Sequence, residues 1–133
     1  MYCNLLQCQH FADTSVVSVQ SDSTGEEMLG FISGYLIPER KNTLFIWQVA
    51  VSEAARGRGL ALAMLQHILD RPQCSDVSYL ETTITESNRA SWALFESLSK
   101  KSHTALEKSI MFDRDEHFAG DHETEYLARI GPF

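Results

Sequence analysis

The sequence lacks the features that mark several large classes of protein. Its three cysteines, Cys3, Cys8 and Cys74, are odd in number and contain no C-x-x-C pair, so neither a disulfide framework nor a zinc site is indicated. No apolar run approaches the roughly 20 residues that span a bilayer, and the N-terminus lacks the basic-then-apolar layout of a signal peptide. We therefore expect no membrane association and a reducing, cytoplasmic location.

Positive charge is also scarce. Eleven basic residues stand against eighteen acidic ones, for a net charge of −7. This balance disfavours nucleic acids and anionic membranes as partners and suits a small cationic substrate. With 133 residues and 44% hydrophobic content, residues 1–133 are expected to form a single domain around one core.

Hydrophobic periodicity divides the chain into helices and strands. Helices are expected at 2–11, 60–69 and 88–101, and polar turns at 21–27 and 38–42. Strands are expected at 15–19, 29–37, 44–51, 77–84, 102–111 and 125–130. An antiparallel meander followed by alternating helices and strands predicts an α/β (α+β) fold, in which a mixed, mostly antiparallel sheet has helices on both faces.

The helical repeat also predicts which side chains are buried. In the first helix Leu5, Leu6 and Phe11 share one side. The second helix has an apolar face made of Leu60, Met64, Leu65, Ile68 and Leu69. The third has a stripe made of Ala90, Ser91, Leu94, Phe95 and Leu98.

The turn between the strand at 44–51 and the following helix is the most informative segment. It reads Arg56-Gly57-Arg58-Gly59-Leu60-Ala61. Two glycines allow consecutive backbone N–H groups to close on an anion at the positive end of the helix dipole, which favours phosphate. The spacing is neither G-x-G-x-x-G nor G-x-x-x-x-G-K-[ST]. It resembles the R/Q-x-x-G-x-G/A signature of the GCN5-related N-acetyltransferase (GNAT) superfamily.

This resemblance implies a binding site for acetyl-CoA as co-substrate. The turn would hold the pyrophosphate, and the backbone of the preceding strand would hydrogen-bond the pantetheine arm and polarise the thioester carbonyl. Asn88 and Phe95 of the 88–101 helix would lie near the pantetheine. The implied cofactor-binding residues are Val49, Val51, Arg56, Gly57, Arg58, Gly59, Leu60, Ala61, Asn88 and Phe95. Many relatives have a catalytic Tyr on this helix, whereas this chain reads Leu94-Phe95-Glu96 there.

Further blocks narrow the resemblance. They are His10-Phe11-Ala12-x-Thr14, Gly34 to Glu39, Leu44 to Val51, Leu80 to Asn88 and the closing His122-x-x-Glu125-x-Leu127-x-Arg129-Ile130-Gly131. Together they resemble the L-2,4-diaminobutyrate acetyltransferases of ectoine biosynthesis. The implied reaction transfers acetyl from acetyl-CoA to the 4-amino group of L-2,4-diaminobutyrate, in a homodimeric enzyme of osmoadaptation.

In the resembled enzymes, substrate contacts correspond to Tyr2, Trp47, His122 and Glu125, of which the last three form the implied catalytic set. The acceptor amine arrives as an ammonium, so a base or a water relay must remove a proton. Glu81, Glu125 and His122 are the candidates by residue type. Glu125 is the preferred amine anchor, with the proton lost through ordered water.

No metal is expected to take part. The acidic stretch 113–125 has no metal-ligand spacing such as H-E-x-x-H, so a solvated loop is favoured there.

The resembled enzymes have an Asp a few residues before the Tyr, in a Leu-Asp-x-Asn-Ser type motif that this sequence does not contain. The domain is therefore expected to be N-terminally shortened. Two alternatives stay open: an N-acetyltransferase for another small diamine or amino acid such as lysine or ornithine, or a catalytically idle protein that binds acetyl-CoA.

Overall fold

Six strands and four α-helices make up the mixed α/β fold that the sequence predicts. The computed structural model describes all 133 residues, in two compact units that divide after Val77. Met1–Val77 contains α1 (Tyr2–His10), β1 (Val16–Asp22), β2 (Gly25–Ile37), β3 (Arg40–Val51) and α2 (Leu60–Leu69), with short 3-10 turns at Ala12–Thr14, Glu53–Ala55 and Pro72–Cys74. Ser78–Phe133 contains β4 (Tyr79–Thr85), α3 (Arg89–Lys101), β5 (Leu106–Phe112), α4 (Arg114–Phe118) and β6 (Glu125–Ile130).

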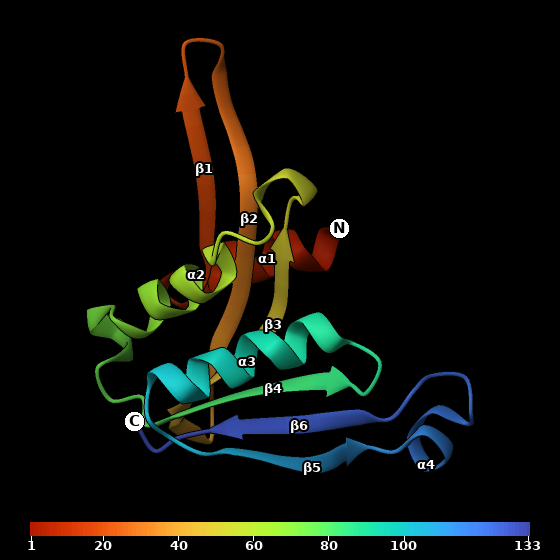
Figure 1. Cartoon of the computed structure of the whole chain (residues 1–133). Coiled ribbons are helices and arrows are strands. Elements are labelled where there is room, and N and C mark those ends of the chain that lie inside the picture. Colours follow the sequence, from red (N-terminus) through yellow and green to blue (C-terminus); the bar gives the residue numbers. More distant parts are fainter. The chain divides into compact units, whose positions relative to one another are not determined.

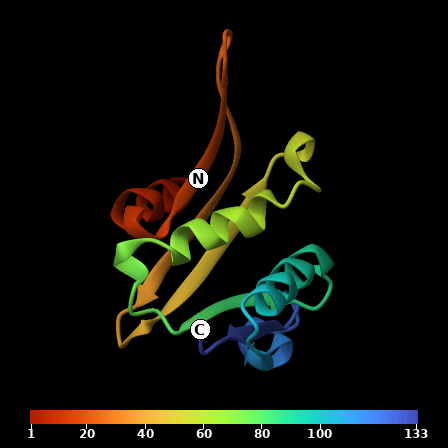
Figure 2. The same cartoon turned by 60° about the vertical axis from the view of Figure 1, so that its left-hand side comes forward.

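In the first unit β1, β2 and β3 form an antiparallel meander, and α1 and α2 cover its opposite faces (Figure 2). Helix α2 buries Met64, Leu65 and Ile68, three of the five positions that the apolar repeat predicts. A methyl group of Met64 lies 3.2 Å from where a Cβ on Gly30 would be, so the absence of a side chain there lets α2 pack closely on β2.

Helix α1 differs from its prediction, because none of its residues is buried. Leu5 is 64% exposed and Leu6 is 37% exposed. An apolar cavity of about 580 Å³ lies between the helix and the β1–β2 face, and Leu5, Cys8, Val17, Met28 and Phe31 are among its lining residues. Of the three side chains predicted to share one side, Leu5 therefore borders an open cavity in place of a packed core.

The β1–β2 hairpin is longer than predicted (Figure 1). Residues 21–27 were expected to be a turn, but Ser21 pairs with Glu26 and Asp22 with Gly25, which leaves only a tight turn at the tip. Asp22 stabilises that turn by accepting a hydrogen bond from the backbone N–H of Thr24 at 2.7 Å. The polar composition misled the prediction because cross-strand backbone hydrogen bonds do not depend on side-chain polarity.

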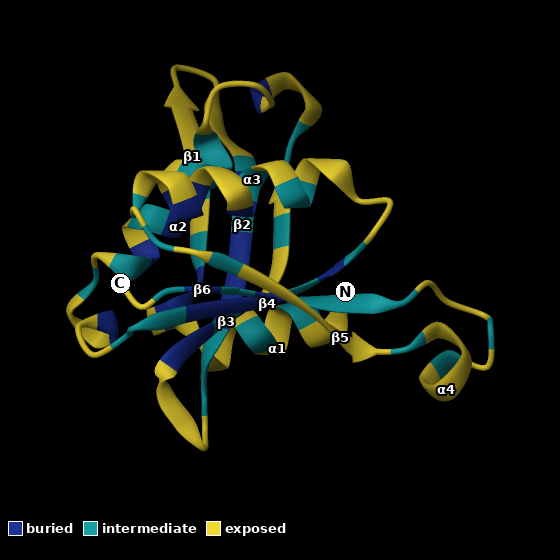
Figure 3. Cartoon of the chain, turned by 60° about the horizontal axis from the view of Figure 1, so that its bottom comes forward, coloured by how far each residue is buried: buried dark blue, intermediate teal, exposed yellow.

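In the second unit β6 is central and pairs antiparallel with β4 on one side and with β5 on the other. The core of this unit consists of Leu80, Ile84, Phe95, Leu98, Ala128 and Ile130. Helix α3 buries Phe95, Leu98 and Ser99, so only the C-terminal part of the predicted stripe is fully enclosed. Strand β5 is largely exposed (Figure 3).

Two boundaries in this unit were predicted wrongly. Strand β5 begins at Leu106 and not at residue 102, because α3 is followed by a turn in which His103 has φ +54°. The stretch 113–125 was expected to be a loop but contains the short helix α4. Asp113 caps that helix by accepting hydrogen bonds from the backbone N–H groups of Asp115 and Glu116.

Arg71 connects distant parts of the first unit. Its Nη1 donates to the carbonyl oxygens of Ala12, Asp13 and Ser15 at 2.8 to 3.0 Å. Its Nε donates to Nδ1 of His67 at 3.3 Å. The guanidinium thereby fixes the connection between α1 and β1 against the end of α2.

We expect Arg71→Lys to lower the free energy of unfolding by about 2 kcal/mol, because an ammonium cannot reproduce the planar set of donors. Urea unfolding measures the loss. Arg89→Lys, at the exposed start of α3, is the matched control and should leave stability unchanged. Equal stability of the two variants would contradict the role of Arg71.

Candidate active site

The β3–α2 turn has the geometry of an anion site. Gly57 and Gly59 have φ values of +77° and +72°, which side chains rarely adopt, and Gly59 is the N-cap of α2. No side chain caps the helix N-terminus, so backbone N–H groups of its first turn are left for a ligand. Arg56 is held beside the turn by a hydrogen bond from its Nε to the carbonyl of Val51 at 3.4 Å. The turn residues Arg56 to Gly59 are exposed, and Leu60 and Ala61 at the helix start are partly buried.

Strand β3 contains a bulge at Trp47 that sequence reasoning missed. Ser33 pairs with Gln48 and Gly34 pairs with Ile46, so Trp47 has no partner in β2. Bulges occur at functional sites because the extra residue redirects a side chain. Trp47 is 44% exposed, an unusual value for a large aromatic residue in a strand. The structure therefore presents Trp47 at the surface, where a ligand can reach it.

The other predicted contacts on β3 are less exposed. Val49 pairs with Ile32 and Val51 with Gly30. Both side chains are partly buried. Any contact that these two residues make with a pantetheine arm would come from the backbone, as the resemblance implies.

The start of α3 combines a helix cap with a predicted ligand contact. The side-chain oxygen of Asn88 accepts a hydrogen bond from the backbone N–H of Ser91 at 3.2 Å. Phe95 is only 2% exposed and packs in the core of the second unit. Its role as a cofactor contact stays a prediction, and the structure shows for this residue the buried position that the helical repeat indicates.

His122 and Glu125 come together at the start of β6. The Nε2 of His122 lies 3.8 Å from Oε1 of Glu125, and the Glu125 side chain is 22% exposed. The ring of His122 also packs against Phe118 of α4, with 4.7 Å between the ring centroids. The two residues that the closing motif indicates thus form one partly exposed acid–base pair.

The loop that carries His122 is fixed by side-chain hydrogen bonds. Ser87 Oγ donates to Oε2 of Glu123 at 2.8 Å, and Thr124 Oγ1 accepts from the backbone N–H of Arg114 at 3.0 Å. At the start of α4, the N–H groups of Glu116 and Asp115 hold the pKa of Asp113 below its ordinary value. Because the folded-state pKa is lowered, this cap stabilises the segment above the ordinary carboxyl pKa and is lost as the pH falls through the lowered value.

Glu81, the third candidate base, is buried and paired. Its Oε1 lies 2.7 Å from Nη1 of Arg129, and its side chain is 3% exposed. The guanidinium of Arg129 also lies over the ring of Tyr79, 3.8 Å from the centroid. A carboxylate engaged in this way is better suited to hold β4 and β6 together than to accept a proton from a substrate.

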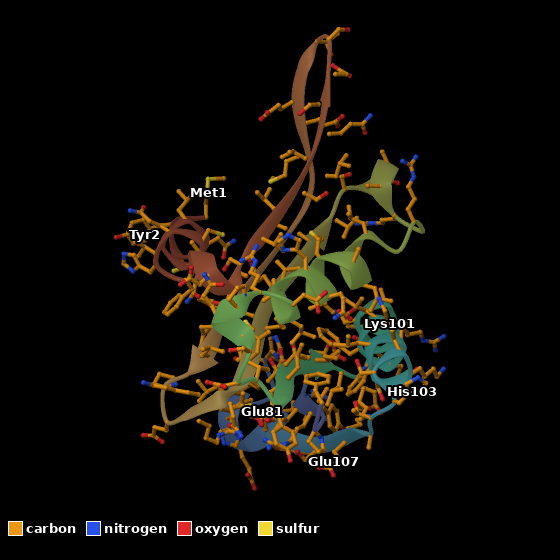
Figure 4. All side chains as sticks on the ribbon, turned by 90° about the vertical axis from the view of Figure 1, so that its left-hand side faces the viewer. Met1, Tyr2, Glu81, Lys101, His103 and Glu107 are labelled. Atoms are coloured by element: carbon orange, nitrogen blue, oxygen red, sulfur yellow. The ribbon has the colours of Figure 1, made fainter.

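Tyr2 stands at the exposed start of α1, with 73% of its surface accessible (Figure 4).

No group of three or more His, Cys, Asp and Glu side chains is arranged to hold a metal ion. None of the helices is long and apolar enough to cross a membrane.

Comparison with known proteins identifies the family. The model of the acetyltransferase (GNAT) family matches residues 2–99, a range that includes both β3 and the glycine turn. The chain belongs to the acetyltransferase (GNAT) family. Membership confirms the predicted fold and the predicted enzyme class, an acyltransferase that takes its acetyl group from acetyl-CoA.

Individual GNAT relatives are similar over nearly the whole chain. A protein from Methylotuvimicrobium alcaliphilum, described as an L-2,4-diaminobutyric acid acetyltransferase, is 56% identical over 133 residues, which cover all of this chain and 75% of the relative. A protein of the same description from Vibrio cholerae is 49% identical over 129 residues, covering 97% of this chain and 72% of the relative.

A solved GNAT structure is similar as well. It is the diaminobutyrate acetyltransferase EctA of Paenibacillus lautus in complex with its substrate L-2,4-diaminobutyric acid and coenzyme A. The TM-score is 0.87 at 34% identity, and the match covers 98% of this chain and 77% of the other. The predicted resemblance to diaminobutyrate acetyltransferases is confirmed.

Proposed function

We propose that this chain transfers the acetyl group of acetyl-CoA to the 4-amino group of L-2,4-diaminobutyrate. The observation that carries the proposal is the 56% identity, over the full length of this chain, to a relative described as an L-2,4-diaminobutyric acid acetyltransferase. The chain retains the glycine turn, the exposed Trp47 and the His122–Glu125 pair. The glycine turn suits the anionic donor, acetyl-CoA. Trp47 and the His122–Glu125 pair suit the cationic acceptor.

The donor would bind along the β3–α2 turn. The backbone of Val49 and Val51 would hydrogen-bond the pantetheine arm, and the segment Arg56 to Ala61 would hold the pyrophosphate. The uncapped N-terminus of α2 and the adjacent Arg56 and Arg58 supply positive charge. An N–H group of the β3 backbone that donates to the thioester oxygen would stabilise the charge that develops there by roughly 3 kcal/mol.

The acceptor would bind through its ammonium groups and through stacking. Glu125 offers a partly exposed carboxylate next to His122. Trp47 and Tyr2 offer exposed aromatic faces for aliphatic or cationic parts of the substrate.

We expect Glu125→Gln to raise the KM for diaminobutyrate about tenfold, because one charge-assisted contact is lost, while the KM for acetyl-CoA stays the same. Initial-rate kinetics with each substrate varied in turn measures both values, and an equal rise in both would contradict the assignment.

Residues 1–133 would act as one acetyltransferase domain, and a family match that runs from the first unit into the second as far as residue 99 supports this. The product would be the acetylated precursor that a separate synthase cyclises to ectoine, so the enzyme would serve osmoadaptation in the cytoplasm. We also propose a homodimer, in keeping with the resembled enzymes.

The decisive experiment measures release of free CoA from acetyl-CoA with diaminobutyrate, ornithine and lysine as acceptors, and identifies the acetylated nitrogen by NMR. Selective acetylation of the 4-amino group of diaminobutyrate is the expected result. Preference for ornithine or lysine would move the assignment to the longer diamines. Binding of acetyl-CoA without any turnover would indicate an idle protein.

Asn88 offers a test of the donor site that separates capping from binding. Asn88→Asp keeps an oxygen that accepts from Ser91, so the melting temperature should stay within about 1 °C of the parent protein. The new carboxylate should raise the KM for acetyl-CoA several-fold if Asn88 faces the pantetheine, because it removes the amide donor and adds a negative charge. An unchanged KM would restrict Asn88 to its capping role.

A further inference from the structure

We infer that Nε2 of His122 is the atom that takes the proton from the acceptor ammonium, and that Phe118 and the Glu123 backbone hold the ring in the tautomer this requires. The inference rests on the proposed function and deepens it by naming a base. It stands on three contacts of the loop before β6.

The first contact fixes the tautomer. Nδ1 of His122 lies 2.7 Å from the backbone carbonyl oxygen of Glu123. A carbonyl oxygen can only accept, so the hydrogen of the neutral ring must be on Nδ1. The lone pair is then on Nε2, which is the nitrogen that faces Glu125 at 3.8 Å.

The second contact gives the protonated ring a counter-charge. An ammonium bound to the Glu125 carboxylate lies next to Nε2, because the two side-chain atoms are so close. When Nε2 accepts a proton, the resulting imidazolium faces the same carboxylate and is stabilised by it. The carboxylate of Glu123 accepts a hydrogen bond from Ser87, whereas the carboxylate of Glu125 is the one that lies near Nε2.

The third contact holds the ring in place. Phe118 packs on His122 with 4.7 Å between centroids and a 45° tilt. Phe118 itself is steadied by the edge of Phe112 at 6.3 Å. Phe118 is therefore a positioning residue, which acts on the reaction through His122.

The proton balance of the reaction is complete with this assignment. Nε2 takes one proton from the ammonium, and the amine lone pair forms the N–C bond to the acetyl carbonyl. The C–S bond breaks and its electron pair leaves on sulfur. The second proton that nitrogen loses ends on that sulfur as the thiol of CoA, and the imidazolium returns its proton to solvent.

A neighbouring histidine provides an internal reference for the tautomer. Nδ1 of His117 accepts a hydrogen bond from the backbone N–H of Asp113 at 2.8 Å, so its hydrogen must be on Nε2. The structure thus assigns opposite tautomers to two histidines five residues apart. Two-bond ¹⁵N–¹H correlation spectra of the ligand-free protein in mildly alkaline buffer distinguish them. Protonated Nδ1 at His122 with protonated Nε2 at His117 is the expected result, and protonated Nε2 at His122 would overturn the inference.

Kinetics test the function of the tautomer. We expect His122→Gln to lower kcat about 100-fold, the ordinary contribution of a general base, with little change in the KM for acetyl-CoA. In the parent protein kcat/KM should fall as the pH is lowered, because a protonated Nε2 cannot accept. His117→Gln is the control and should change neither the rate nor the pH profile.

Phe118 completes the test. Phe118→Leu should lower kcat several-fold and broaden the ¹⁵N–¹H correlation signals of the His122 ring. Phe118→Tyr keeps an aromatic ring, so its kcat and its His122 signals should be those of the parent protein. A His122→Gln variant with full activity would overturn the inference. Absence of diaminobutyrate acetylation by the parent protein would instead contradict the proposed function, because the tautomer is measured without substrate.

Discussion

Replacing Gly59 by valine is expected to raise the KM for acetyl-CoA by about two to three orders of magnitude while the KM for diaminobutyrate changes little. Gly59 is the N-cap of α2 and has φ +72°. A β-branched residue at this φ is strained by about 1 to 3 kcal/mol, and relief of the strain would turn the N–H groups of the turn away from the pyrophosphate. Charge-assisted hydrogen bonds to phosphate contribute roughly another 2 kcal/mol.

Two further variants separate strain from loss of the ligand. Gly59→Asn keeps the backbone conformation, because asparagine tolerates positive φ, and should show an intermediate KM. Gly25→Val introduces the same residue at φ +133° in the β1–β2 hairpin. It should lower the melting temperature without changing either KM. Isothermal titration with CoA provides an activity-independent measurement, and equal losses for donor and acceptor after Gly59→Val would disprove the anion site.

Replacing Arg129 by methionine is expected to lower the free energy of unfolding by about 3 kcal/mol. The guanidinium is 2.7 Å from Glu81, whose side chain is 3% exposed. Removing one partner of a buried ion pair leaves the other charge in a poorly solvated place. The contact of Arg129 with the face of Tyr79 is lost as well. Urea unfolding followed by circular dichroism measures the change.

Arg129 has a carboxylate neighbour on each side in the sheet, and only that of Glu81 is buried. In the register of the sheet Arg129 pairs with Glu81 of β4 on one side and with Glu107 of β5 on the other. Glu107 is exposed, so its carboxylate remains solvated in the variant. The double variant Glu81→Gln/Arg129→Met removes the buried charge and should regain at least half of the lost stability. If the double variant is less stable than Arg129→Met, the loss has a cause other than the buried charge of Glu81.

Local patterns predicted much of the fold correctly. The bounds of α2 are as predicted, and those of α3 differ by one residue, because an apolar repeat of 3.6 residues and a capping residue such as Asn88 act within a few residues of chain. The glycine turn is equally local, since the absence of side chains permits the positive φ values of Gly57 and Gly59. The strands were found, but their ends were not. The hairpin at Asp22 to Gly25 continues through polar residues because its partner strand, and not its composition, supplies the hydrogen bonds.

The site follows the same division. The closing motif indicated His122 and Glu125 as residue types, but their separation of 3.8 Å and the tautomer depend on where the loop places the ring. Nothing in the neighbourhood of Trp47 signals a bulge, because a bulge is a mismatch in length between two strands. Glu81 was a reasonable candidate base by type, and only its pairing with Arg129, 48 residues away, reveals a structural role.

The sequence by itself determined the family, the order of helices and strands, the glycine turn before α2 and the residues whose type allows them to accept a proton, since each depends on neighbours in the chain. The tertiary structure alone decided which of the predicted site residues are exposed to solvent and which are buried. It exposes Trp47, places Phe95 in the core and pairs Glu81 with Arg129. These outcomes depend on contacts between segments distant in sequence, whose free energies no local pattern contains.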